Sequence, residues 1–466
     1  MSYPSFLSYV GNSLSVRGVS VNSFRVEAQS TGAVSANQKI SFNLPENAIL
    51  DMQSTKLMFK ASCTGDGARL PQNIATLFSS MQVTAGGVTI MSGTGNFGVI
   101  EKIKAIGHNM PPDPVKENGF MTTLYGKDGQ AKGTSSAATA ESYASYDGAL
   151  FSIKLGDLAS MSPRLVDTSI LPGLRVEFTV ASNNVLSSVK GTQVEGSSSN
   201  HPFTTVNGNT TVTFSISDYF VCANVYSISD GIYPMLIENR IVQNQAVEIN
   251  VIDHIPFEDN QFTGNMRASL STANLSKLIA IFRLNGFSTI QAPTTIAGYK
   301  TDNSYALSSL GDAAAYTGSF NRFTAPVDNA TNANLYTANN AAKNKYNDSP
   351  LPKLQFSINS ANLPQWTPTV AEWYDLTKWC FNVKHLGVTG LVDYLNTSFV
   401  MAFPLDLPGS GTNQTGLDTR GSNSAISVKA PSTIGLETTD AFNCLLVAQT
   451  VKTILVGAGK AIEVVS

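Results

Sequence analysis

A glycine-rich stretch is the first feature of the sequence whose residue types could do chemistry. Gly93, Gly95 and Gly98 have the G-x-G-x-x-G spacing and precede a helix-like run at 98–108. In dinucleotide-binding folds these glycines let the backbone approach a pyrophosphate at a helix N-terminus. Such a site also needs a preceding parallel strand and an acidic residue about 20 residues further on. Here the Gly-Gly pair at 86–87 predicts a hairpin before the motif, and a polar loop follows it. We therefore interpret the motif as a turn that leads into a helix.

Nucleophilic and metal chemistry have no support in the spacing of the other reactive residues. There is no H-E-x-x-H or G-x-S-x-G pattern, and the cysteines form no C-x-x-C pair. Cys380 and His385 are five residues apart on a predicted helix, which places them on different faces. We predict no catalytic, cofactor-binding or metal site, and we interpret the cysteines as buried thiols. The residues considered are His108, His201, His254, His385, Cys63, Cys222, Cys380 and Cys444.

Two clusters leave open a β-sandwich protein that binds or hydrolyses glycans. Trp366, Trp373 and Trp379 lie close together and could stack on a sugar, although core or interface anchors are the favoured interpretation. The nearest acidic group is Asp253, Glu258 and Asp259, but its spacing does not give the separation of about 5 to 10 Å that glycoside hydrolysis needs.

Composition limits the partners of the chain. Charged residues make up 14% of the 466 residues and the net charge is -3, so a bulk electrostatic attraction to nucleic acid or acidic membrane is not expected. The first residues lack the pattern of a signal peptide, and no apolar run reaches the about 20 residues that span a bilayer. We expect a soluble chain made inside a cell.

Alternation with a period of two predicts a mainly β chain. The pattern is clear in the segments 40–44, 57–63, 174–180, 212–216, 247–251, 354–358, 451–456 and 460–465. Helices are predicted only at 70–81, 98–108 and 367–385, with Thr367 as a cap, Pro368 in the first turn, and a stripe of Val370, Trp373, Leu376 and Cys380. The helices interrupt runs of strands, which is typical of sandwiches with helical inserts rather than of parallel βαβ units.

The length fits two large β domains. Two long polar stretches at 109–147 and 286–350 carry little periodicity, and a third at 187–209 marks the domain boundary. We predict an N-terminal arm over 1–21, a first domain over 22–205 and a second over 206–466.

The order of these segments resembles that of the double jelly-roll major capsid proteins of icosahedral DNA viruses, such as virophages, polinton-like viruses and large algal viruses. Three segments of this sequence resemble the start of the first roll in those proteins. They are FNLPENAILDMQSTKLMFKAS, LPQNIATLFSSMQVTAGGVTI and GNFGVIEKIKAIGH. Two further segments, DYFVCANVYSISDGIYPMLIEN and AVEINVIDHIPF, resemble the opening of the second roll. The segment AFPLDLPGSGTNQTGLDTRGSNSAISVKA resembles the loop and strand that follow the last helix of that roll.

The resemblance implies two tandem eight-stranded antiparallel jelly rolls with a few short helical inserts and two long loops. It implies a structural subunit of the virion, not an enzyme, that trimerises into pseudo-hexameric capsomers. Its partners would be copies of itself, minor capsid or penton proteins and, in some shells, an internal membrane. A minor capsid or attachment protein of the same fold remains an alternative.

The N-terminal arm is the predicted assembly interface. Only Arg17 and Arg25 precede Lys39, so the arm lacks the clustered cations that neutralise phosphates, and no sequence-specific nucleic-acid binding is expected. Its apolar residues suit insertion beneath a neighbouring subunit, with ordering on assembly. These are Tyr3, Phe6, Leu7, Tyr9 and Val10.

Overall fold

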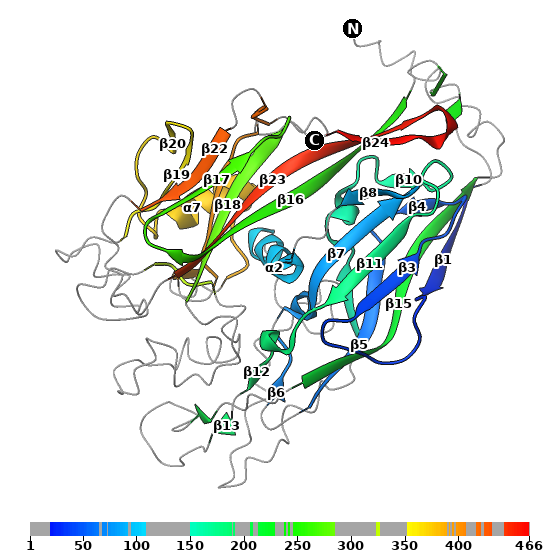
Figure 1. Cartoon of the computed structure of the whole chain (residues 1–466), viewed down its shortest axis with the longest axis horizontal. Coiled ribbons are helices and arrows are strands. Elements are labelled where there is room, and N and C mark those ends of the chain that lie inside the picture. The colour runs from blue at the N-terminus through cyan, green and yellow to red at the C-terminus, as the bar shows by residue number, and fades with distance from the viewer. Residues whose placement is uncertain are drawn as a thin grey trace.

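The computed structural model shows two β-sandwiches side by side (Figure 1). It describes residues 19–64, 68–71, 73–91, 95–108, 150–188, 190–191, 206–207, 213–228, 237–238, 241–242, 246–284, 323–326, 352–388, 391, 394–395, 398–406, 416–420, 424–430 and 442–465. In these residues no helix is long and apolar enough to cross a bilayer.

The first sandwich has two antiparallel sheets that face each other. One sheet contains β1 (Val19–Glu27), β2 (Val34–Ser35), β4 (Ile49–Asp51), β5 (Lys56–Thr64), β9 (Leu150–Lys154), β10 (Leu165–Asp167) and β15 (Thr213–Ile228). The other contains β3 (Lys39–Asn43), β7 (Phe78–Ala85), β8 (Val88–Met91) and β11 (Arg175–Val180). Two short pairs lie outside these sheets: β6 (Ala68–Arg69) with β12 (Ser187–Ser188), and β13 (Lys190–Gly191) with β14 (Val206–Asn207).

The second sandwich is built in the same way. Its first sheet contains β16 (Ala246–Phe262), β18 (Leu275–Leu284), β21 (Val400–Pro404), β23 (Phe442–Gly457) and β24 (Ile462–Val465). Its second contains β17 (Asn265–Leu270), β19 (Gln355–Ile358), β20 (Ala361–Leu363) and β22 (Ser424–Lys429). The helices described in full are α2 (Phe97–Gly107) and α7 (Trp373–Phe381), with the short 3-10 helices η2 (Ile74–Leu77), η4 (Gly156–Ser160), η5 (Asn183–Val185) and η8 (Ala458–Lys460).

Both sandwiches repeat one strand order, which is that of a jelly roll. In the second sandwich the eight strands β16 to β23 pair as β16-β23-β18-β21 and β17-β22-β19-β20, so the first, eighth, third and sixth strands form one sheet. In the first sandwich β1, β15, β5 and β9 take those same places, and β3-β11-β7-β8 form the opposite sheet. Two Greek keys per sandwich give this order. The predicted fold of two tandem antiparallel jelly rolls is confirmed.

By its strand pairing, the first roll extends beyond the predicted domain boundary at 205/206. The segment 213–228, which lies within the predicted second domain, is the eighth strand of the first roll: Val221 pairs with Leu57 on one side and with Val26 on the other. Alternation reveals a half-buried strand but not the sheet that it joins, because the residues that pair with β15 lie at least 149 positions earlier in the chain. The pairing favours a division after Ile228.

The predicted helices have three outcomes. The helix at 98–108 is confirmed as α2. The predicted helix at 70–81 is wrong: only the four residues of η2 are helical, and the alternating burial from Phe78 onward belongs to β7. The third helix, α7, begins at Trp373 rather than at Thr367 and Pro368, because Pro368 and Val370 hydrogen-bond to the strand-like segment 352–354. Its N-terminal side is capped instead by Thr369, whose hydroxyl accepts from the Glu372 amide while the Glu372 carboxylate accepts from the Thr369 amide.

The hydrophobic residues form two cores, and two strands belong to both. Ile249 and Val251 of β16 and Ile454 and Val456 of β23 lie in the first core, whereas the other ends of these strands line the second core. β16 pairs with β23 along nearly its whole length, over about 55 Å by the rise of a strand. This ribbon therefore runs through both rolls (Figure 1).

Candidate functional site

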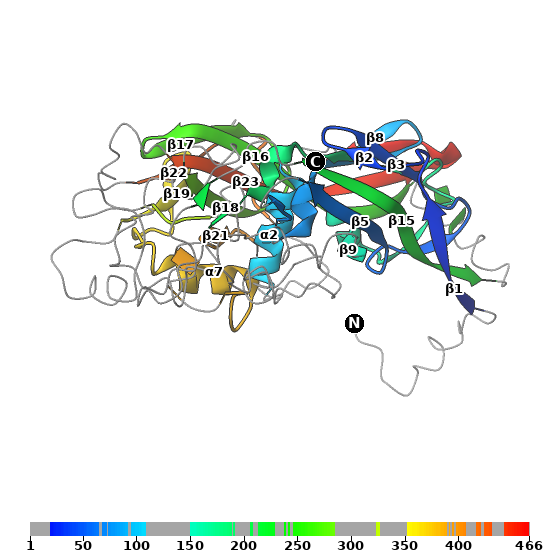
Figure 2. The same cartoon turned by 90° about the horizontal axis from the view of Figure 1, so that it is seen from below.

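The junction of the two rolls is the candidate site, and α2 is the element that fills it (Figure 2). α2 follows the fifth core strand of the first roll, yet its apolar residues serve both cores. Phe97 packs in the first core, whereas Val99, Ile103 and Ile106 are buried in the second. The helix therefore acts as a wedge shared by the rolls.

Two glycines of α2 allow neighbouring segments to approach closely. A Cβ atom on Gly98 would clash with the backbone of η2, since it would lie 2.7 Å from the Thr76 nitrogen. A Cβ atom on Gly107 would lie 2.7 Å from the ring of Phe381 in α7. The last glycine of the G-x-G-x-x-G spacing thus serves helix packing, and Gly95 has nothing within 4 Å of its own added Cβ. Gly93 lies outside the described residues.

We predict that Gly98→Ala destabilises the protein whereas Gly95→Ala does not. The added methyl at residue 98 meets backbone atoms that cannot rotate away, so overpacking should cost about 1 to 3 kcal/mol of unfolding free energy. Chemical denaturation of both variants, read by tryptophan fluorescence, measures the difference. Wild-type stability of Gly98→Ala would contradict the packing role, and a similar loss of stability in both variants would point to a shared role of the two glycines.

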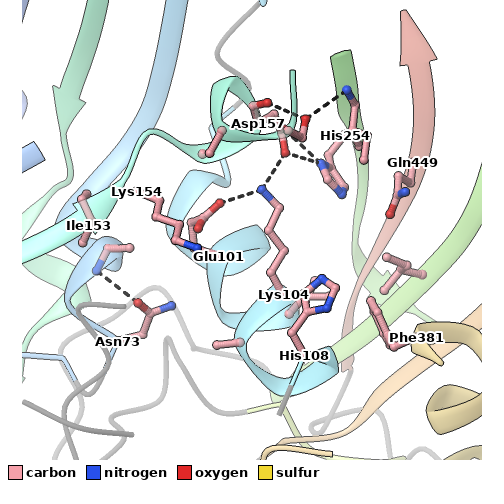
Figure 3. Close-up of a pocket in the computed structure, with 18 of the residues that line it drawn as sticks. Asn73, Glu101, Lys104, His108, Ile153, Lys154, Asp157, His254, Phe381 and Gln449 are labelled. Atoms are coloured by element: carbon pink, nitrogen blue, oxygen red, sulfur yellow. Dashed lines mark hydrogen bonds and ion pairs between the residues drawn. The ribbon is translucent and has the colours of Figure 1, made fainter. Parts of the chain in front are cut away.

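A largely buried ion cluster, whose lysine and carboxylates keep about a fifth or less of their side-chain surface exposed, connects the elements at this junction (Figure 3). Lys104 of α2 donates to Glu101 at 2.8 Å and to Asp157 of η4 at 2.6 Å. His254 of β16 lies with its Nδ1 2.9 Å from the Asp157 carboxylate. Because an ionised carboxylate only accepts, His254 Nδ1 carries the proton of this hydrogen bond. Asp157 thereby joins two elements of the first roll to the long ribbon.

The cluster shifts the acid–base equilibria of its members. Burial alone would raise the pKa of Asp157, but the interactions with His254 and Lys104 outweigh it and hold that pKa well below the usual range. Burial would lower the pKa of Lys104, but Asp157 and Glu101 outweigh it and raise that pKa. The stabilisation from Asp157 is therefore present above its unfolded pKa of about 4 and is lost as the pH falls toward the folded value. That from Lys104 is present below about pH 10 and is lost as the pH rises through its folded pKa.

Replacing Asp157 with Asn should therefore lower stability at neutral pH and remove part of its acid dependence. We expect a loss of about 1 to 3 kcal/mol at pH 7, since Lys104 keeps its pair with Glu101 but loses the Asp157 carboxylate, and His254 loses an ionised acceptor. Between about pH 4 and pH 2 the wild type should lose more unfolding free energy than the variant. Urea titrations at several pH values test this, with Asp218→Asn as the control because its pair with Lys60 is exposed. Parallel pH curves for wild type and Asp157→Asn would contradict the assigned role.

Backbone pairing strengthens the same junction. Ser162 and Asn250 exchange two hydrogen bonds of 2.8 Å between their amides and carbonyls. The Ser160 hydroxyl accepts from the Ile252 amide at 3.1 Å. Because these bonds tie the segment after η4 to β16, the first roll is fixed to the ribbon by backbone as well as by charge.

The carboxylates considered for the glycan-hydrolysing alternative do not converge. Asp253 and Glu258 are five residues apart on β16, which puts them on opposite faces and about 17 Å apart along the strand. Asp253 forms an ion pair with Lys452, and Glu258 pairs with Arg283 at 2.9 Å. Asp259 accepts from the amide of Gln261. This spacing exceeds what the two carboxylates of a glycosidase span.

The aromatic and thiol residues also separate in space. Trp373 is fully buried and donates to the Leu354 carbonyl, whereas Trp366 and Trp379 are 51% and 54% exposed. Cys380 is buried and His385 is exposed. Burial raises the pKa of Cys380 to about 12, so this thiol is not an activated nucleophile.

The remaining sequence predictions are answered in part. Cys222 is half-buried and Cys444 is buried; both are free thiols. The described residues contain no cluster of three potential metal ligands. Of the histidines, His108 and His254 both line the junction, which scattered sequence positions could not indicate. The side chain of Cys63, His201, and the arm residues Tyr3, Phe6, Leu7, Tyr9 and Val10 lie outside the described residues.

The strand β1 is an exposed apolar surface that the sequence analysis did not single out. It pairs with β15 along its whole length, and its side chains from Ser20 to Arg25 are exposed. Val21 and Phe24 are 53% and 47% exposed, and their odd spacing places them on opposite faces of the strand. Among the described residues β1 pairs only with β15, and an unpaired strand edge is a place where another chain can associate.

Comparison with known proteins agrees with this architecture. No family model matches the chain, and no curated protein matches it. Among solved structures, the Faustovirus major capsid protein is similar over 94% of this chain and 90% of that one, with 9% identity and a TM-score of 0.53. The PBCV-1 virus capsid model covers 96% of each chain with 12% identity and a TM-score of 0.47. The mavirus major capsid protein covers 95% of this chain and 89% of that one, with 10% identity and a TM-score of 0.44. At 9% identity, the likeness to the Faustovirus protein concerns the fold alone.

Proposed function

We propose that the chain is a major capsid protein whose trimers form pseudo-hexameric capsomers of an icosahedral virion. The observation that carries the proposal is the repeated jelly-roll order over nearly the whole described chain, and the likeness in fold to the Faustovirus major capsid protein supports it. The mechanism is geometric. Three chains place six similar β-sandwiches around one axis, which gives a block with a nearly six-sided outline.

A shell subunit must keep the two rolls in a fixed relative position, because neighbours tile only if each block has one shape. The shared ribbon β16–β23, the wedge α2 and the buried cluster around Asp157 supply that rigidity. This arrangement supports a load-bearing subunit. The wide separation of Asp253 and Glu258 gives the glycan-hydrolysing alternative no comparable support.

We assign β1 to the contact between subunits. Its apolar residues are exposed on both faces while its backbone is held by β15, so the strand is preformed and association would not have to order it. Covering Val21 and Phe24, each about half exposed, should contribute about 1 to 1.5 kcal/mol apiece.

The purified chain should be a trimer that persists on dilution, and loss of the β1 contact should weaken it. We expect Val21→Ser combined with Phe24→Ser to raise the trimer dissociation constant about tenfold or more, without lowering monomer stability. Asn22→Ser, on the same strand, is the matched control because it removes no apolar area. Analytical ultracentrifugation over a dilution series measures this. A stable monomer at micromolar concentration would contradict the proposed function, whereas a trimer unaffected by the double substitution would contradict only the role of β1.

The arm over residues 1–21 is proposed to bind beneath a neighbouring subunit through Tyr3, Phe6, Leu7, Tyr9 and Val10. Deletion of residues 2–18, which precede β1, should leave the thermal midpoint and the trimer unchanged but reduce assembly of trimers into larger arrays. Negative-stain microscopy of arrays formed at high protein concentration tests this. A control arm of equal length, with these five residues replaced by Ser, should behave like the deletion. Arrays of normal yield from either variant would exclude the arm as an interface.

A further inference from the structure

A pocket of about 460 Å³ opens at the junction and takes its walls from both rolls (Figure 3). The first roll contributes residues of α2, β9 and η4, and the second contributes residues of β16, β18, β23 and α7. Much of the wall is apolar, formed by Ile103, Ile153, Ile252, Ile279 and Phe381. This volume lies within the range of about 300 to 1,000 Å³ that is typical of small-molecule sites.

The charges that line the pocket do not balance. Three lysines, Lys104, Lys154 and Lys277, face two carboxylates, Glu101 and Asp157. Both carboxylates are engaged by Lys104, at 2.8 and 2.6 Å. Within the part of the chain that the structure describes, Lys154 and Lys277 have no carboxylate within 4.0 Å. The ammonium groups of Lys154 and Lys277 are therefore available to pair with an anion that enters the pocket.

The pKa of His108 also reflects the positive charge of these three lysines. This residue ends α2 at the mouth of the pocket, with its ring 5.7 Å from the ring of Phe381. Its pKa is lowered, first by desolvation and then by the positive charges of Lys277, Lys104 and Lys154. The C-terminal carbonyls of α2 oppose these positive charges by about half a charge, but one of them, that of Ile106, accepts from the Gly387 amide.

We propose that this pocket binds a small organic anion, whose carboxylate or phosphate head pairs with Lys154 and Lys277 and whose apolar body lies against the isoleucine wall. An inorganic ion alone would leave the apolar wall in water, and a neutral ligand would leave the lysines without an anion. Because Lys154 belongs to the first roll and Lys277 to the second, the bound anion would bridge them. Binding to the folded state alone stabilises it by mass action.

Decanoate and octyl phosphate are suitable probes, with decanol and inorganic phosphate as the partial ligands. We expect the acidic amphiphiles to raise the thermal midpoint and to bind by calorimetry at least about tenfold more tightly than either partial ligand. Comparison of decanoate with octyl phosphate distinguishes the two headgroups. Binding of decanoate, but not of decanol, should weaken as NaCl rises from about 50 to 500 mM, because screening acts on the charged head.

Combined Lys154→Gln and Lys277→Gln should weaken decanoate binding about tenfold or more and leave decanol binding unchanged. Lys460→Gln, in the exposed η8, is the matched control. Undiminished decanoate binding in the double variant would overturn the proposal, as would phosphate binding as tight as that of the amphiphiles. If the double variant does not fold, the salt dependence in the wild type decides, and a flat dependence overturns the proposal. None of these outcomes depends on whether the chain forms a capsid.

Discussion

The structure depends on the antiparallel ribbon of β16 and β23, because its residues are needed by two cores at once. At one end Val251 and Ile454 close the first core, and at the other Leu445 and Val447 are buried in the second. Neither roll can bury its apolar residues fully without the ribbon, and a strand pair of about 55 Å resists bending between its two attachment points. The rolls are therefore coupled through a shared element of secondary structure rather than through a flexible linker.

A shared ribbon alone would leave a gap between two convex sandwiches, and α2 fills it from the side. Its backbone approaches η2 at Gly98 and α7 at Gly107, where any side chain would collide. This close packing brings Lys104, Glu101 and Asp157 out of water, which is unfavourable unless each charge has a partner. Asp157 receives two partners, and one of them, His254, is on the ribbon. The polar cluster thus follows from the packing and also makes it specific, since sliding the ribbon by one residue would turn His254 away.

Much of the fold could be predicted from the sequence, because period-two burial is a local property. The alternation of Val176, Phe178 and Val180 predicts β11, and Gly86 and Gly87 predict the turn that joins β7 to β8, where both have positive φ. Pairing is not local, so the sequence pattern places β15 in the second domain, whereas the strand belongs to a sheet of the first roll. The cluster at the junction was beyond prediction for the same reason: Lys104, Asp157 and His254 come together only after both rolls have formed.

The duplicated order gives the two helices comparable positions with different roles. α2 and α7 each follow the fifth core strand of their roll and precede the sixth, and they meet where Gly107 contacts Phe381. α2 is almost entirely covered, whereas α7 is covered on one side by the second core and exposes Trp379 on the other. An internal repeat therefore places one helix between the rolls and the other at the surface of the block. In a ring of six sandwiches, every second junction would lie between two chains rather than within one chain. The ribbon of β16 and β23 closes only the junction within a chain, so the junctions between chains would need other contacts. Side-chain contacts must supply that closure, and the apolar residues exposed on β1 are of the kind that such contacts require.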